Sequence, residues 1–173
     1  QESVVLPARS IVVLAANPCP CGDYHADASV DRCKCREVQR RDYRRKVTGP
    51  ITDRIDITRH LTAARPTARR DPLAVRESSA EVRERVTVAR ARQADRYADE
   101  AWRLNGHAPG PALATRWPLT PAAAALVDDQ LWKGRLTRRG VTRVHRLAWT
   151  VADLAGVDQP GVTEAGVALR LRS

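Results

Sequence analysis

Two closely spaced pairs hold all four cysteines of the chain. The first pair is Cys19 and Cys21, and the second is Cys33 and Cys35. Cysteines that serve only as core side chains scatter along a sequence, whereas four thiols in one short stretch are typical of a tetrahedral metal site. Structural zinc binds four such ligands. The sequence therefore predicts a structural zinc site, formed by a polar loop that folds the second pair back onto the first.

Two other states of these cysteines stay open. Each pair is separated by one residue instead of the two residues of the commoner C-x-x-C pattern, so the clustering of thiols is better supported than the identity of the metal. Disulfides would be expected in a secreted chain. No signal peptide pattern precedes the cluster, and we expect a cytoplasmic protein. Zinc is therefore favoured over two disulfides or four reduced thiols.

The charge of the chain favours a polyanionic partner. Its net charge is +10 and its pI is about 10.4. Clustered arginines neutralise phosphates and release counterions, which would favour DNA. A biased genome composition is an equal alternative, since nearly all the basic residues are arginine. No apolar run approaches the about 20 residues of a membrane span, so no membrane partner is expected.

The first part of the chain has the pattern of an α/β fold. Residues 11–16 form a continuous apolar run, as in a strand buried within a parallel sheet. Residues 36–46 form a basic stretch that is compatible with a helix, and residues 51–57 alternate as in a short strand. Ser78 and Glu81 form a capping-box pattern. It predicts a helix over residues 79–103, with inward-facing Val82, Val86 and Ala89.

The second part of the chain has the pattern of a small helical domain. Residues 105–118 are rich in Gly and Pro and are expected to form a linker. Three helices are predicted after it, over residues 120–134, 138–154 and 162–171. The middle helix has apolar residues on one face, and on the other face it carries three arginines: Arg139, Arg143 and Arg146.

A series of motifs carries a resemblance to a known family. The motifs, in chain order, are Asn17-Pro-Cys-Pro-Cys-Gly22, Arg32-Cys-Lys-Cys35, Gly49-Pro-Ile-Thr-Asp-Arg-Ile-Asp56, Val82-Arg-Glu-Arg-Val86, Ala89-Arg-Ala-Arg-Gln93 and Thr137-Arg-Arg-Gly140. Together they resemble the ComM/YifB-type magnesium-chelatase-like AAA+ ATPases over nearly the whole chain. The resemblance implies an α/β fold. Residues 1–105 would be the C-terminal part of a P-loop-type core, a parallel sheet with helices and a four-cysteine loop insertion. Residues 106–118 would be a linker, and residues 119–173 a small all-helical lid.

The resemblance also implies an activity. Members of this family would use ATP and Mg²⁺ to move on DNA as a homo-hexameric ring, with branch migration in recombination or natural transformation as the usual role. Asn17 lies at the family's sensor-1 position, and Arg54 resembles an arginine finger presented to a neighbouring subunit. Arg139 lies at the sensor-2 position, where Arg143 and Arg146 share its face and would support it or touch DNA.

Each of these roles has a structural alternative. Asn17 is also a residue that ends a strand before proline. Arg54 has Asp53 and Asp56 beside it, and such neighbours commonly form surface ion pairs. Arg143 and Arg146 are also consistent with a solvated basic helix face.

Two features expected of a working ATPase are absent from this sequence. It has no G-x-x-x-x-G-K-[ST] loop to hold phosphates, and no apolar strand that ends in paired acids to hold Mg²⁺. The chain also opens at Gln1 without a Met. We therefore expect a C-terminal fragment that does not hydrolyse ATP alone. The alternatives are a stand-alone, zinc-stabilised basic DNA-binding module and an inert truncated product.

Overall fold

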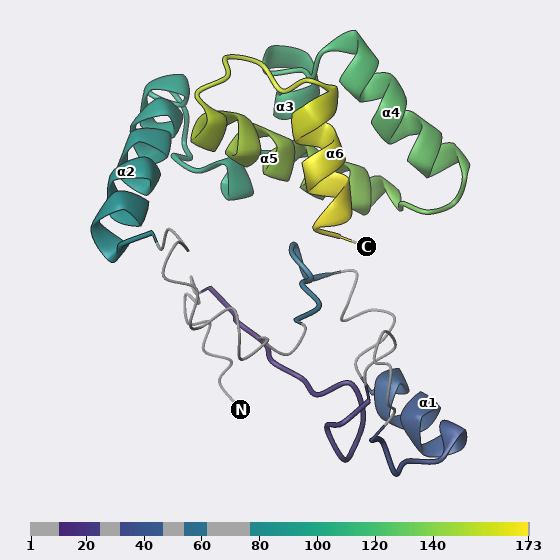
Figure 1. Ribbon diagram of the computed structural model, residues 1–173. Coiled ribbons are helices and arrows are strands. Elements are labelled where there is room, and N and C mark those ends of the chain that lie inside the picture. The colour runs from purple at the N-terminus through teal and green to yellow at the C-terminus, as the bar shows by residue number, and fades with distance from the viewer. Residues whose placement is uncertain (1–10, 25–31, 47–53, 62–76, 173) are drawn as a thin grey trace, which may run out of the picture. The chain divides into compact units, whose positions relative to one another are not determined.

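Helices account for all the regular structure in the described part of the chain. A computed structural model describes residues 11–24, 32–46, 54–61 and 77–172. These residues contain six α-helices and one 3-10 helix, η3, and no strand (Figure 1). The chain divides into two compact units, residues 1–49 and 50–173.

The first unit contains the cysteine loop and helix α1, Glu37–Arg45. Its apolar run, residues 11–16, forms no strand, and Ile11 and Val13 are 89% and 86% exposed. A strand of a parallel sheet needs at least one neighbouring strand to bind its backbone. The described residues supply no such neighbour, so the predicted sheet core is not confirmed.

The second predicted strand, residues 51–57, is also not observed in its described part. Residues 54–57 form no strand, and residues 51–53 lie outside the described part of the chain. The α/β core therefore stays an expectation from the family resemblance, while the helical part of the fold is observed directly.

Helix α2, Ser79–Arg96, begins at the predicted capping box. The Ser78 hydroxyl accepts a hydrogen bond from the Glu81 amide, and the Glu81 carboxylate accepts one from the Ser78 amide. The helix ends at Arg96 instead of near residue 103, because Tyr97 turns into a buried aromatic cluster with Trp102 and Trp117.

The inward face predicted for this helix is only partly observed. Ala89 is 4% exposed, as predicted. Val82 and Val86 are 38% and 42% exposed, so their predicted burial is wrong within the described structure. The α2 face that packs on α5 begins near Ala89 and continues toward Gln93, both of which are buried.

The predicted linker, residues 105–118, is folded. It contains η3, Asn105–His107, and α3, Gly110–Arg116. Ala108 and Leu113 are fully buried against Trp149. Two of its prolines mark the start of α3, since Pro109 is the N-cap and Pro111 lies in the first turn. A domain boundary at residues 106–118 stays a prediction.

The last three helices begin and end close to the predicted residues. They are α4, Pro121–Trp132, α5, Arg138–Ala155, and α6, Val162–Arg170. Thr120 and Thr137 cap the amide groups of Ala123 and Gly140 at the starts of α4 and α5. Gly156 ends α5 with a φ of 73°.

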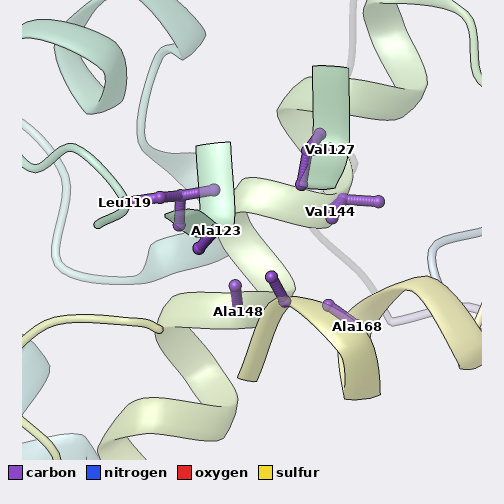
Figure 2. Packing of buried hydrophobic residues seen from close by; sticks show 7 residues of the cluster. Leu119, Ala123, Val127, Val144, Ala148 and Ala168 are labelled. Atoms are coloured by element: carbon purple, nitrogen blue, oxygen red, sulfur yellow. The ribbon is translucent and has the colours of Figure 1, made fainter. Parts of the chain in front are cut away.

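Helix α5 is central to the second unit because it is buried on two faces. One face packs with α4 and α6 in a cluster of seven buried residues: Leu119, Ala123, Val127, Val144, Ala148, Ala165 and Ala168 (Figure 2). Four of the seven are alanines, whose small side chains allow the helices to approach closely. The other face places Trp149 against Tyr97, Ala108 and Leu113. No described helix is both long and apolar enough to cross a membrane.

Candidate functional site

The cysteine loop brings the four thiols together, as predicted. The Cys19 and Cys21 sulfurs are 3.3 Å apart, and each lies 3.6 Å from the Cys33 sulfur. All four sulfurs, that of Cys35 included, lie within 4.8 Å of one another. A tight turn sets this geometry, since the Gly22 amide donates to the Cys19 carbonyl at 3.1 Å and Gly22 adopts a φ of 87°.

The thiols differ in acidity. None forms a disulfide. A hydrogen bond from the Asp23 backbone, with further bonds from Cys19 and Lys34, lowers the pKa of Cys21 to about 6. The backbone at Cys21 lowers the pKa of Cys35, but desolvation and the neighbouring thiols outweigh it and raise that pKa to about 12. Desolvation raises the pKa of Cys33.

This donor set fits a metal ion that accepts four sulfur ligands. Four thiolates so close together repel one another, and a divalent cation among them would remove that repulsion. A set of four sulfurs is one of the arrangements that structural zinc sites use. Cys19 is buried and Cys21 is exposed, so the group lies at the surface of the first unit.

A strongly basic helix follows the cysteines directly. Residues 32–46 contain eight Arg or Lys residues and two acids. The Arg40 guanidinium lies 4.6 Å from the centre of the Tyr24 ring and bonds Glu37 at 2.7 Å, so it attaches α1 to the loop. Arg41, Arg44 and Arg45 keep more than half of their side-chain surface exposed.

In the second unit, the predicted finger residue lies in a segment that the last helices hold. Arg54 is exposed. The Arg143 side chain of α5 donates to the Arg54 carbonyl, and its Nη1 lies 3.0 Å from an Asp56 carboxylate oxygen. The Thr58 amide donates to the Leu171 carbonyl at 2.7 Å. Asp53, the other expected neighbour of Arg54, lies outside the described residues.

The three arginines of α5 that the sequence singles out, Arg139, Arg143 and Arg146, have different surroundings. Arg146 donates twice to the Ala108 carbonyl, at 2.9 and 2.7 Å, and burial lowers its pKa. Arg143 also binds a main-chain carbonyl, whereas Arg139, in the first turn of α5, is exposed. A role for each of them at a nucleotide stays a prediction.

Asn17 lies in the first unit, apart in sequence from these arginines. It is exposed and follows no strand in the described structure. Its side chain lies over Gly22, where a Cβ would be 3.6 Å from the Asn17 Nδ2. The structure thus places Asn17 beside the cysteine turn, and its sensor-1 role stays a prediction.

A buried polar network between α2 and α5 was missed in the sequence. Asp153 is 2% exposed, accepts from both terminal nitrogens of Arg96, and accepts from Asn105 at 2.9 Å. The Asn105 side-chain oxygen, Oδ1, accepts a hydrogen bond from the Tyr97 hydroxyl at 2.9 Å. Arg96 also lies 3.9 Å from the centre of the Trp149 ring. The sequence signal for this network is Asp153 itself, which lies between apolar neighbours in an amphipathic helix. A buried acid needs polar partners, so its position indicates a buried polar network.

Two protein-family models together match almost the whole chain. Residues 76–172 match the protein-family model described as "Magnesium chelatase, subunit ChlI C-terminal", and residues 1–69 match the one described as "Magnesium chelatase, subunit ChlI". No solved structure matches the chain.

Curated relatives match the chain over a part of their own length. An uncharacterized protein of Mycobacterium tuberculosis is 39% identical over 166 residues, which cover 96% of this chain and 32% of the relative. The uncharacterized protein YifB of Escherichia coli is 29% identical over a region that covers 89% of this chain and 29% of the length of YifB. Competence protein ComM of Haemophilus influenzae is 28% identical over a region that covers 94% of this chain and 31% of the length of ComM. The chain thus spans about a third of the length of these relatives.

Proposed function

Because the chain belongs to the magnesium chelatase ChlI family, we propose that it acts as the C-terminal part of an AAA+ ATPase that moves on DNA. The competence protein among its relatives supports a role in competence. We infer recombination or natural transformation as the process, with branch migration as the reaction. The proposal for the whole protein includes ATP, Mg²⁺, a homo-hexameric ring and a cytoplasmic location.

The observation that carries this proposal is the presentation of Arg54. Its segment is bound to α5 and to the residue that follows α6, while Arg54 itself is exposed. A guanidinium that serves a neighbouring subunit must reach outward from a firmly held backbone. At the neighbour's nucleotide it would stabilise the charge that builds on the transferred phosphoryl group.

Two further residues complete the proposed site. Asn17 would orient the attacking water, because an amide both donates and accepts hydrogen bonds. Arg139 would bind the γ-phosphate from the first turn of α5, where it is exposed. Zinc, bound by the four cysteines, would fix the loop that follows Asn17.

A chimaera tests the finger. This chain replaces the matching third of the Mycobacterium tuberculosis relative, and ATP turnover and nucleotide affinity are measured separately. We expect Arg54→Ala to lower kcat by about 10³-fold with little change in nucleotide affinity. The matched control is Arg59→Ala, an exposed arginine of the same segment, which should retain turnover. Full turnover in Arg54→Ala would show that the finger assignment is wrong.

The basic helix α1 supports a second candidate, a zinc-stabilised module that binds duplex DNA without ATP. Its exposed arginines follow the metal-binding loop directly. The isolated chain would then bind DNA with a steep salt dependence. Arg41→Ala and Arg45→Ala should each reduce the salt slope by about 1, and Arg90→Ala on α2 is the control. Absence of DNA binding by the chain, with turnover in the chimaera, would favour the ATPase.

A further inference from the structure

Four contacts hold the five residues 54–58 against the C-terminal helices. Arg143 binds the Arg54 carbonyl and the Asp56 carboxylate. Arg172 donates to the Ile55 carbonyl at 3.1 Å. The Thr58 amide donates to the Leu171 carbonyl at 2.7 Å. The donors and acceptors come from α5 and from the two residues after α6, so this segment follows the C-terminal helices as one piece.

Arg143 is the residue that binds the backbone of Arg54 itself. Its side chain is only 16% exposed, so its hydrogen bond to the Arg54 carbonyl is partly shielded from water. Fixing that carbonyl restricts rotation of the Arg54 backbone and therefore the direction in which the Arg54 side chain leaves it. The Asp56 carboxylate, 3.0 Å from the same Nη1, also holds the Arg143 guanidinium in place.

We propose that Arg143 is a positioning residue for Arg54, which transmits movement of the C-terminal helices to the finger. This inference rests on the proposed function of Arg54. It also gives Arg143 a different task from the nucleotide contact that the family resemblance implies. The same Nη1 serves the Arg54 carbonyl and Asp56, so a phosphate could bind there only after both contacts break.

The first test uses this chain alone and needs no ATPase activity. Hydrogen exchange is measured at the amides of residues 54–61. Arg143→Ala should speed exchange of the Thr58 amide about tenfold, because its segment loses one of its anchors. Arg138→Ala, which removes an exposed arginine from the same helix, should leave it unchanged. Unchanged exchange in Arg143→Ala, with α5 still protected, would overturn the proposal.

The second test separates positioning from nucleotide binding in the chimaera. Arg143→Ala should lower kcat by about 10- to 100-fold with an unchanged KM for ATP, since small displacements of a catalytic group have effects of this size. Asp56→Asn should have a smaller effect in the same direction, and the double variant should be no worse than Arg143→Ala alone. Arg143→Lys should recover kcat only in part, because an ammonium on a lysine stem does not occupy the position of the guanidinium Nη1.

Contrary outcomes differ for the two proposals. A raised KM or weaker nucleotide binding in Arg143→Ala, with Asp56→Asn unaffected, would assign Arg143 to the nucleotide and overturn the positioning role. If Arg54→Ala retains full turnover, the finger fails, and the hydrogen-exchange result still decides whether Arg143 holds the segment.

Discussion

Asp153 and Asp158 both pair with arginines of α2, but they differ in exposure. The Asp153 side chain is fully buried beside Arg96, whereas the Asp158 side chain beside Arg92 is 98% exposed. Asp153→Ala should lower the free energy of unfolding by about 3 kcal/mol, because Arg96 and Asn105 lose a buried partner. Asp158→Ala should change it by about 0–1 kcal/mol. Urea unfolding of both variants checks this, and equal effects would contradict the importance of burial.

The four cysteines give a second prediction at the scale of residues. Protein purified without added metal should carry about one zinc ion per chain, and its thiols should resist alkylation until a chelator removes the metal. Cys33→Ser should lose most of the zinc, because Cys33 lies 3.6 Å from both Cys19 and Cys21. Disulfides would instead leave the thiols unreactive after chelation and reactive only after reduction.

The end of α5 provides a test at the scale of elements. Gly156 has a φ of 73° and open space where a Cβ would stand, so any effect of an alanine there comes from the backbone conformation. Gly156→Ala should therefore destabilise the protein by about 1 kcal/mol. Gly106→Ala also meets open space but without a positive φ, and should have an effect within about 0.5 kcal/mol. Thermal unfolding compares the two, and equal losses would contradict this account of the helix end.

The elements that sequence predicts well are those with local signals. The caps at Ser78, Thr120 and Thr137 and the stop at Gly156 lie within a few residues of the helices they define. The four-thiol loop is also readable, since its ligands come as two pairs. The end of α2 was misplaced because Tyr97 is drawn into a cluster with Trp117, twenty residues further on. Such a contact leaves no trace in local periodicity.

In the candidate site, too, local sequence motifs and contacts between distant segments differ in how well they can be predicted. Arg54 and Arg139, which the motifs single out, are exposed, and their roles stay predictions. Arg143 and Arg146 bind the main-chain carbonyls of Arg54 and Ala108, which lie in distant segments, and a carbonyl carries no sequence signature. Sequence therefore finds the arginines but cannot tell which of them support the backbone.

Across the second unit as a whole, one buried histidine couples stability to pH. His145 is 9% exposed, and its Nε2 lies 2.9 Å from the Trp117 carbonyl, which also accepts from Trp149 at 2.9 Å. A carbonyl only accepts, so Nε2 carries the hydrogen of the neutral ring. Desolvation lowers the pKa of His145 and outweighs the opposing hydrogen bond to Trp117.

The sign of the pH dependence follows from this lowered pKa. Below the value of about 6.5 for an unfolded histidine, the unfolded chain binds a proton that the folded chain does not. The free energy of unfolding should therefore be constant above about pH 7.5 and should fall as the pH drops from about 7 toward 5. Tryptophan fluorescence measures this for the second unit alone, because all four tryptophans lie in it. His145→Gln should flatten the dependence, since an amide can still donate to the Trp117 carbonyl without titrating. The exposed His107→Gln should retain the slope, and an unchanged slope in His145→Gln would assign it to other groups.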